Sequence, residues 1–227
     1  LSDFRRITGT LEHAAFVYTD GMSRLPPLYN AMRGFDSDES SVRRISESVA
    51  GTLDWWLARL RDTSVTRQLY PLQELRDLGL YVDASTSWGI GLYFDGKWSA
   101  FELAPTWKGD GGRDICWLEA VALELLLLFM HQLGLTHGRF RIYSDNMGAI
   151  GAHTKGRSSN EHINLCVRRS ISFAARHLLV LDFVYVASAD NPADPISRGD
   201  LGPPSLHIKR KFALPDVLSE CLRDAHA

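Results

Sequence analysis

Residues 78–103 read LGLYVDASTSWGIGLYFDGKWSAFEL, and this stretch decides the fold. It contains three runs rich in β-branched and aromatic residues, over 80–82, 89–94 and 98–103. Ser and Thr residues separate the first two runs, and Asp95-Gly96, a dipeptide typical of tight hairpin turns, separates the second from the third. The stretch therefore predicts an antiparallel meander of three strands.

Beyond residue 103 the pattern alternates between helix and strand. It predicts a long helix over 115–133, a strand over 140–144, a short helix over 146–153, a long helix over 160–178 and a strand over 180–186. The order of elements is then βββαβααβ, in which helices connect the later strands. This order predicts an α/β fold: a mixed, five-stranded sheet flanked by helices.

The two flanks of this region differ from it in pattern. Residues 1–77 are mainly helical in spacing, with Leu53, Trp56, Leu57 and Leu60 on one helix and with breakers or loops over 24–27 and 34–41. Gly202-Pro203-Pro204 marks a linker, and 215–225 has the composition of a terminal helix. We therefore divide the chain into a helical appendage (1–77), a central domain (78–200) and a linker with a C-terminal helix (201–227).

Composition excludes several classes of protein. The 227 residues carry a net charge of −2, with 45% hydrophobic and 23% charged residues, which indicates a packed protein whose contact with nucleic acid would need a local basic patch. Three cysteines without CxxC spacing argue against disulfides or a zinc knuckle and indicate three buried thiols in a reducing compartment. We expect an intracellular protein, cytoplasmic or nuclear.

Membrane insertion is not expected either. The most apolar stretch, 121–130, is interrupted by Glu124 and is shorter than the roughly 20 residues that cross a bilayer. No signal peptide opens the chain, which begins at Leu1 and resembles a segment of a longer polyprotein.

Acidic residues stand at the ends of predicted strands. Asp83 ends the first strand, Asp145 ends the fourth, and Asp194 follows the last. Ligand sites of α/β sheets gather at strand ends, so the three aspartates are candidates to converge. Taken alone, each aspartate could also be an ordinary turn or helix-cap residue.

A fourth carboxylate, Glu119, lies on the helix predicted over 115–133. At 100° per residue it shares a line with Leu123, Leu126 and Met130, which predicts that it faces the core. Glu124 falls on the opposite side with His131, where we expect solvent. A carboxylate on an apolar face requires a metal ion or a basic partner, and a buried Glu–Arg pair is the alternative to a metal site.

Three strand-end aspartates and one inward-facing glutamate form an all-oxygen, anionic ligand set. Such a set matches Mg²⁺ or Mn²⁺ better than zinc, which prefers nitrogen and sulfur. Two such ions about 4 Å apart activate a water and stabilise the leaving oxygen of a phosphodiester. The residues thus favour a nuclease.

These residues occur in four blocks that resemble the ribonuclease H domain of retroelement reverse transcriptases. The blocks are Tyr81-Val82-Asp83-Ala84-Ser85, Trp117-Leu118-Glu119-Ala120, Tyr143-Ser144-Asp145-Asn146 and Asn191-Pro192-Ala193-Asp194-Pro195-Ile196-Ser197-Arg198. The carboxylates are 36, 26 and 49 residues apart, similar to the family layout. The last block is the most specific, and is typical of long-terminal-repeat and tyrosine-recombinase retrotransposons.

The resemblance implies a ribonuclease H fold in which Asp83, Glu119, Asp145 and Asp194 bind two Mg²⁺ or Mn²⁺ ions. It implies endonucleolytic hydrolysis of the RNA strand of an RNA/DNA hybrid, and fusion to, or association with, a polymerase domain. Residues 1–77 resemble, more weakly, the thumb and connection region of reverse transcriptases. The chain lacks a Tyr-x-Asp-Asp polymerase motif, and it also lacks, over 183–193, the histidine that many relatives carry before the last aspartate.

Basic residues that could grip the substrate concentrate in one segment. Between residues 153 and 177 five basic residues stand against one acidic residue, and Ser158 with Glu161 form a capping-box pattern. His162, Arg169 and Arg176 fall on one helix face, which is either a phosphate-binding stripe or an ordinary solvated surface. The predicted nucleic-acid contacts are Ser85, Asn146, Lys155, Arg157, Arg169 and Arg176, with a DNA-strand surface near Trp88 and Trp117.

Three other functions remain open from the sequence. A four-carboxylate exonuclease normally has Asp-x-Glu on the first strand, where this chain has Asp83 and Ser85. A transposase or integrase would leave Asp194 unexplained. A catalytically inactive ribonuclease H-like scaffold that only binds nucleic acid is the main alternative, and the retention of four carboxylates argues against it.

Overall fold

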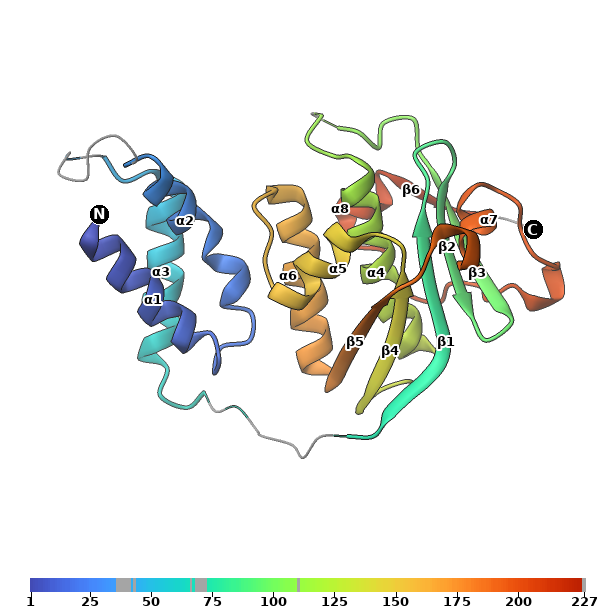
Figure 1. The fold of residues 1–227 in the computed structure, drawn as a ribbon, viewed down its shortest axis with the longest axis horizontal. Coiled ribbons are helices and arrows are strands. Elements are labelled where there is room, and N and C mark those ends of the chain that lie inside the picture. Colours follow the sequence, from blue (N-terminus) through green and yellow to red (C-terminus); the bar gives the residue numbers. More distant parts are fainter. Residues whose placement is uncertain (36–41, 43, 66, 68–72, 110, 226–227) are drawn as a thin grey trace.

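The structure is a computed structural model that describes residues 1–35, 42, 44–65, 67, 73–109 and 111–225. Figure 1 shows a group of N-terminal helices beside a larger α/β part, in which helices cover one face of a twisted sheet. The α/β class predicted from the sequence is confirmed.

The sheet is mixed and has six strands in the order β5-β4-β1-β2-β3-β6. The strands are β1 (Leu75–Ala84), β2 (Gly89–Phe94), β3 (Lys97–Leu103), β4 (Gly138–Ser144), β5 (Leu179–Tyr185) and β6 (Leu222–Asp224). The predicted meander is confirmed, because β1–β2 and β2–β3 are antiparallel. β4 is parallel to both β1 and β5, so the ends of β1 and β4 lie at the same edge.

The sixth strand corrects the prediction for the C-terminus. Residues 215–225 contain only the short helix α8 (Asp216–Ser219) and then β6, which pairs antiparallel with β3. β6 extends the meander because Leu222 is buried and the free edge of β3 offers backbone partners. A three-residue strand of this kind is defined by its partner and not by its own pattern.

Three helices pack near the sheet: α4 (Ile115–Gln132), α5 (Met147–Lys155) and α6 (Glu161–Arg176). α4 is capped by Asp114, whose side chain accepts from the Trp117 amide. By length and composition alone α4 would suit a membrane span, but most of it is buried inside the protein. Asn160, not Ser158, caps α6 by accepting from the Ile163 amide, which corrects the predicted capping box.

The N-terminal helices are α1 (Ser2–Ala14), α2 (Pro26–Arg33) and α3 (Glu47–Arg61), and they form a small core of their own. Leu25, Leu28 and Trp56 are buried in it, whereas Leu57 and Leu60 are about half exposed, contrary to the predicted helix face. The break expected at 24–27 is only partly present: Leu25 belongs to no helix, but Pro26 occupies the first turn of α2, where its missing amide hydrogen costs nothing. Most of the loop expected over 34–41 lies outside the described residues.

Polar contacts join the two parts through a short 3-10 turn, η1 (Met22–Arg24). The side chains of Asn164 and Arg168 on α6 donate to the Ser23 carbonyl, at 2.7 and 3.0 Å. Arg157, just after α5, donates to Glu12 of α1 at 2.9 Å. The sheet begins at Leu75, so β1 includes residues that the sequence pattern placed in the appendage.

Candidate metal centre

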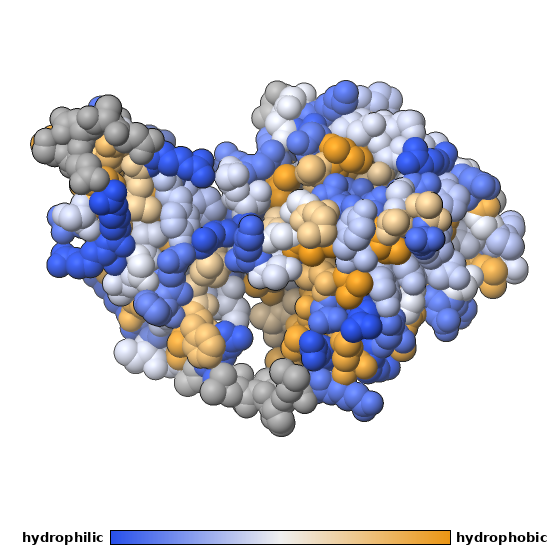
Figure 2. Space-filling model, in the orientation of Figure 1, coloured by the Kyte–Doolittle hydropathy of each residue, from blue (hydrophilic) through white to orange (hydrophobic). Residues whose placement is uncertain are grey.

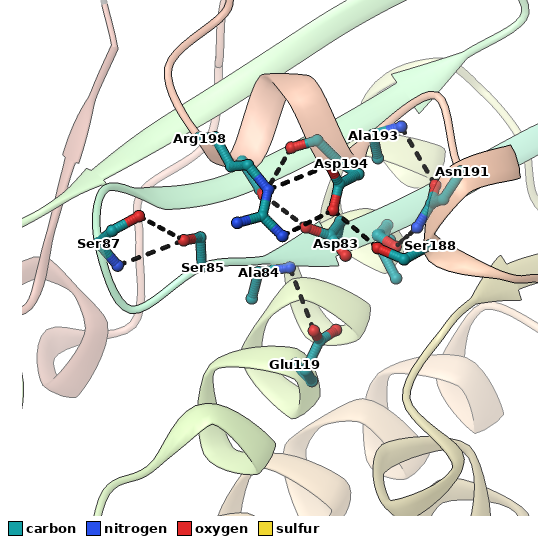
Figure 3. A network of polar contacts seen from close by, with 12 residues as sticks. Asp83, Ala84, Ser85, Ser87, Glu119, Ser188, Asn191, Ala193, Asp194 and Arg198 are labelled. Atoms are coloured by element: carbon teal, nitrogen blue, oxygen red, sulfur yellow. Dashed lines mark hydrogen bonds and ion pairs between the residues drawn. The ribbon is translucent and has the colours of Figure 1, made fainter.

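Three of the four predicted carboxylates converge. Asp83 lies at the end of β1 and Asp145 just after β4, and these strands are parallel neighbours. Glu119 points from α4 toward the end of β1 (Figure 3). Asp83, Glu119 and Asp145 each offer an oxygen atom, and these atoms lie within 4.8 Å of one another. This acid triad is the one such group found among the described residues.

Burial and mutual repulsion disfavour the charged forms of two members of the triad. Burial raises the pKa of Glu119 to about 9, and the charges of Asp83 and Asp145 add to the shift. Burial also raises the pKa of Asp83 to about 7; a hydrogen bond from Ser197 opposes this shift, and neighbouring Asp145 and Asp194 reinforce it. A site of this kind gains stability when a cation neutralises it.

One oxygen of Glu119 has no hydrogen-bond partner among the described residues. The side chain is 3% exposed, and its Oε1 accepts from the Ala84 amide at 3.3 Å. Its Oε2 is buried without a hydrogen-bond partner in the part of the chain that the structure describes. A buried glutamate that has one oxygen without a partner and that is grouped with two aspartates fits a hard divalent cation such as Mg²⁺ or Mn²⁺. The predicted alternative, a Glu119–Arg pair, is wrong.

Asp194 does not join the triad. It begins the four-residue helix α7 (Asp194–Ser197), and its carboxylate accepts hydrogen bonds from Ser188 at 2.8 Å and from Arg198 at 2.9 and 3.1 Å (Figure 3). The Arg198 guanidinium holds the pKa of Asp194 below its ordinary value. Asp194 is nevertheless close enough for its charge to raise the pKa of Asp83.

The position of α7 depends on residues for which the sequence predicts no individual role. Asn191 is buried and donates to the Val82 carbonyl of β1 at 2.9 Å, while Ser197 donates to the Asp83 carboxylate. A Cβ on Gly91 of β2 would lie 2.5 Å from the Ala193 carbonyl oxygen, so only glycine allows this approach. Asn191 and Ser197 belong to the last sequence block, and that membership was the one sign in the sequence that they matter. Nothing in the sequence marks Gly91.

The prediction that Glu124 faces solvent is wrong. Glu124 is 4% exposed, and both of its oxygens accept from the Arg169 guanidinium, at 2.6 and 2.8 Å. The helix wheel places Glu119 correctly because α4 packs on the sheet, but α6 covers the opposite side of α4. Arg169 is therefore half of a structural ion pair, which corrects its assignment to a phosphate-binding stripe.

Of the other predicted nucleic-acid contacts, some form hydrogen bonds within the protein and others are exposed to solvent. Ser85 is buried beside Ser87, and the Asn146 side chain caps α5 by accepting from the Ala149 amide at 2.9 Å. Arg157 is held by Glu12 and Tyr29, whereas Lys155 and Arg176 are exposed.

Two expectations about aromatic and thiol side chains need correction. Trp117 is buried in the core and cannot contact a DNA strand, and Trp88 is half-buried. Of the three cysteines, Cys166 and Cys221 are buried as expected, but Cys116 is only partly buried.

A cleft of about 960 Å³ lies between the N-terminal helices and α5. Figure 2 shows a hollow between the two parts of the molecule on the face it presents. The basic residues that line the cleft are Arg5, Arg33, Lys155 and Arg157. Met147 and Gly148, at the start of α5, also line the cleft, and they follow Asp145 by two and three residues in the sequence.

No family model matches this chain, and no curated protein matches it either.

Proposed function

We propose that this chain is a metal-dependent ribonuclease H that hydrolyses the RNA strand of RNA/DNA hybrids internally, as part of a retroelement reverse transcriptase. The observation that carries the proposal is the acid triad of Asp83, Glu119 and Asp145, whose Glu119 has a buried Oε2 without a hydrogen-bond partner among the described residues. The order and spacing of the four sequence blocks support the same assignment.

Asp83, Glu119 and Asp145 would hold Mg²⁺ or Mn²⁺, with Asp194 as the fourth ligand. When bound, such ions lower the pKa of a water and neutralise charge on the leaving oxygen of a phosphodiester. Glu119 must lose its proton to bind, because its pKa is about 9 without a cation. The Ala84 amide fixes Glu119, and Ser197 orients Asp83, so the protein arranges the oxygens in advance.

The proposed substrate class is supported by basic residues and by polar residues next to the triad in the sequence. The net charge of −2 provides no general attraction for nucleic acid, so binding must come from local basic residues such as Arg33 and Lys155 in the cleft. A 2′-hydroxyl distinguishes RNA from DNA at a cleavage site. Ser85 and Asn146, which adjoin the triad, are the nearest candidates to contact it.

The test is cleavage of four matched duplexes: RNA/DNA hybrid, double-stranded RNA and double-stranded DNA, and the hybrid with the sequences of its strands exchanged. Each is incubated with Mg²⁺ or with a chelator. We expect metal-dependent cutting of the RNA strand in both hybrids, with 5′-phosphate and 3′-hydroxyl ends. Equal cutting of double-stranded DNA would indicate a general nuclease, and absence of cutting would indicate the binding-only scaffold.

A further inference from the structure

Arg198 is a cation whose contacts connect it with the candidate metal centre. Its Nε and Nη2 donate to the two oxygens of Asp194, and the charges of Asp83 and Asp145 also act on its guanidinium. With Ser188 bound as well, Asp194 has three donors on its carboxylate. A carboxylate held in this way is not free to bind a metal ion.

The backbone that carries Arg198 is fixed, but its side chain is not. Asn191 ties the preceding loop to β1, and α7 approaches β2 at Gly91 too closely to admit a Cβ. The Arg198 side chain is 58% exposed, so it can leave Asp194 without disturbing packing. Asp194 would then face Asp83, whose pKa its charge already raises.

We propose that Arg198 is a positioning residue that sets how many divalent cations the protein binds. Without nucleic acid, Arg198 retains Asp194 and the acid triad takes one ion. A second ion, held in part by Asp194, binds only when Arg198 releases that carboxylate. This inference rests on the proposed metal centre.

The test counts the Mn²⁺ ions bound per chain, in the full chain without nucleic acid, from the electron paramagnetic resonance signal of free Mn²⁺. We expect one ion for the wild type. Arg198→Gln removes the charge and the paired donors, so we expect it to bind two ions, with the affinity for the second raised at least about tenfold. Arg198→Lys keeps the charge but loses the paired donors, so its affinity for the second ion should lie between those of the wild type and Arg198→Gln.

Two controls separate the effect of Arg198 from a general change in charge. Arg61→Gln removes an exposed arginine at the end of α3 and should bind one ion, like the wild type. The double variant Arg198→Gln with Asp194→Asn should return to one ion, because the second ion needs the Asp194 carboxylate.

The outcomes distinguish this inference from the proposed function. One ion in both wild type and Arg198→Gln overturns the role of Arg198 and leaves the metal centre intact. Two ions in the wild type overturn it as well. No ion in either protein, with folding confirmed by circular dichroism, contradicts the metal centre and the role of Arg198 together.

Discussion

The pKa of Glu119 is raised further than the pKa of Asp83. Because the pKa of Glu119 is raised on folding, this residue makes the stability of the protein depend on pH. The folded protein holds the Glu119 proton up to a pKa of about 9, whereas the unfolded chain releases it near 4.5. Between these values the folded state binds more protons than the unfolded state. Without metal, the Glu119 contribution to the free energy of unfolding is therefore lost as pH rises from about 5 to 9.

Glu119→Gln should remove this dependence. In chelator at pH 8 the variant should be more stable than the wild type by at least about 1 kcal/mol, or about 2–4 °C in Tm. Adding Mn²⁺ should raise the Tm of the wild type and have little effect on the variant. Thermal melts from pH 5 to 9 measure both effects. If the Tm of the two proteins fell equally steeply with pH in chelator, burial of Glu119 would not be the source of the pH dependence.

The two glutamates of α4 show what sequence reveals at this scale. Apolar neighbours at helical spacing identify Glu119 as buried, because that periodicity is local. The burial of Glu124 depends on Arg169, which is 45 residues away, so no local pattern reports it. The same holds for Ser197, whose partner Asp83 is 114 positions distant.

At the scale of elements, the Glu124–Arg169 pair joins α4 to α6. Glu124→Ala should lower the free energy of unfolding by about 2–3 kcal/mol, since Arg169 loses its partner but reaches solvent. Replacing both residues with Met should recover most of this loss, because similar apolar side chains fill the space. Urea unfolding of the single and double variants measures the coupling, and additive losses would show that the pair contributes nothing.

Contact between α7 and β2 places the residues around Asp194. Gly91→Ala should disturb it, because the added Cβ would lie 2.5 and 2.6 Å from backbone atoms of Ala193 and Ser197. We expect a loss of about 1–3 kcal/mol of stability and reduced cleavage of hybrid. Gly51→Ala on α3, where nothing lies within 4 Å, is the matched control and should be neutral or stabilising. Equal behaviour of the two variants would argue against the close approach.

Sequence predicts most elements of the central domain because their signals are local. The β1–β3 meander, α4, α5 and α6 all appear near their predicted bounds. β6 does not, because its three residues become a strand only by pairing with β3. The spacing of residues also cannot predict the partner of Asp194. The same block of residues would allow Asp194 to bind Arg198 or to turn toward the acid triad.

At the scale of the whole molecule, the cleft between the N-terminal helices and α5 predicts how binding responds to salt. In an Asp145→Asn background, which should prevent cleavage, Arg33→Gln and Lys155→Gln should weaken hybrid binding. Each should reduce the slope of log K against log salt by about 0.9 or less. Arg61→Gln should leave that slope unchanged, because Arg61 does not line the cleft. Arg169→Met should also leave it unchanged, because Arg169 is paired with Glu124. An unchanged slope in the cleft variants would exclude the cleft as the binding surface.

The catalytic role of the acid triad is tested most directly by the single-turnover rate of RNA-strand cleavage in a hybrid with Mg²⁺, compared between Asp145→Asn and Asp95→Asn. Both variants remove one carboxylate charge with little change in volume, but Asp145 belongs to the acid triad and Asp95 is exposed in the β2–β3 hairpin. We predict that Asp145→Asn reduces cleavage to the rate in chelator, with folding and thermal stability retained, and that Asp95→Asn cleaves like the wild type. Cleavage by Asp145→Asn at the wild-type rate would contradict the assignment of the acid triad as the catalytic centre.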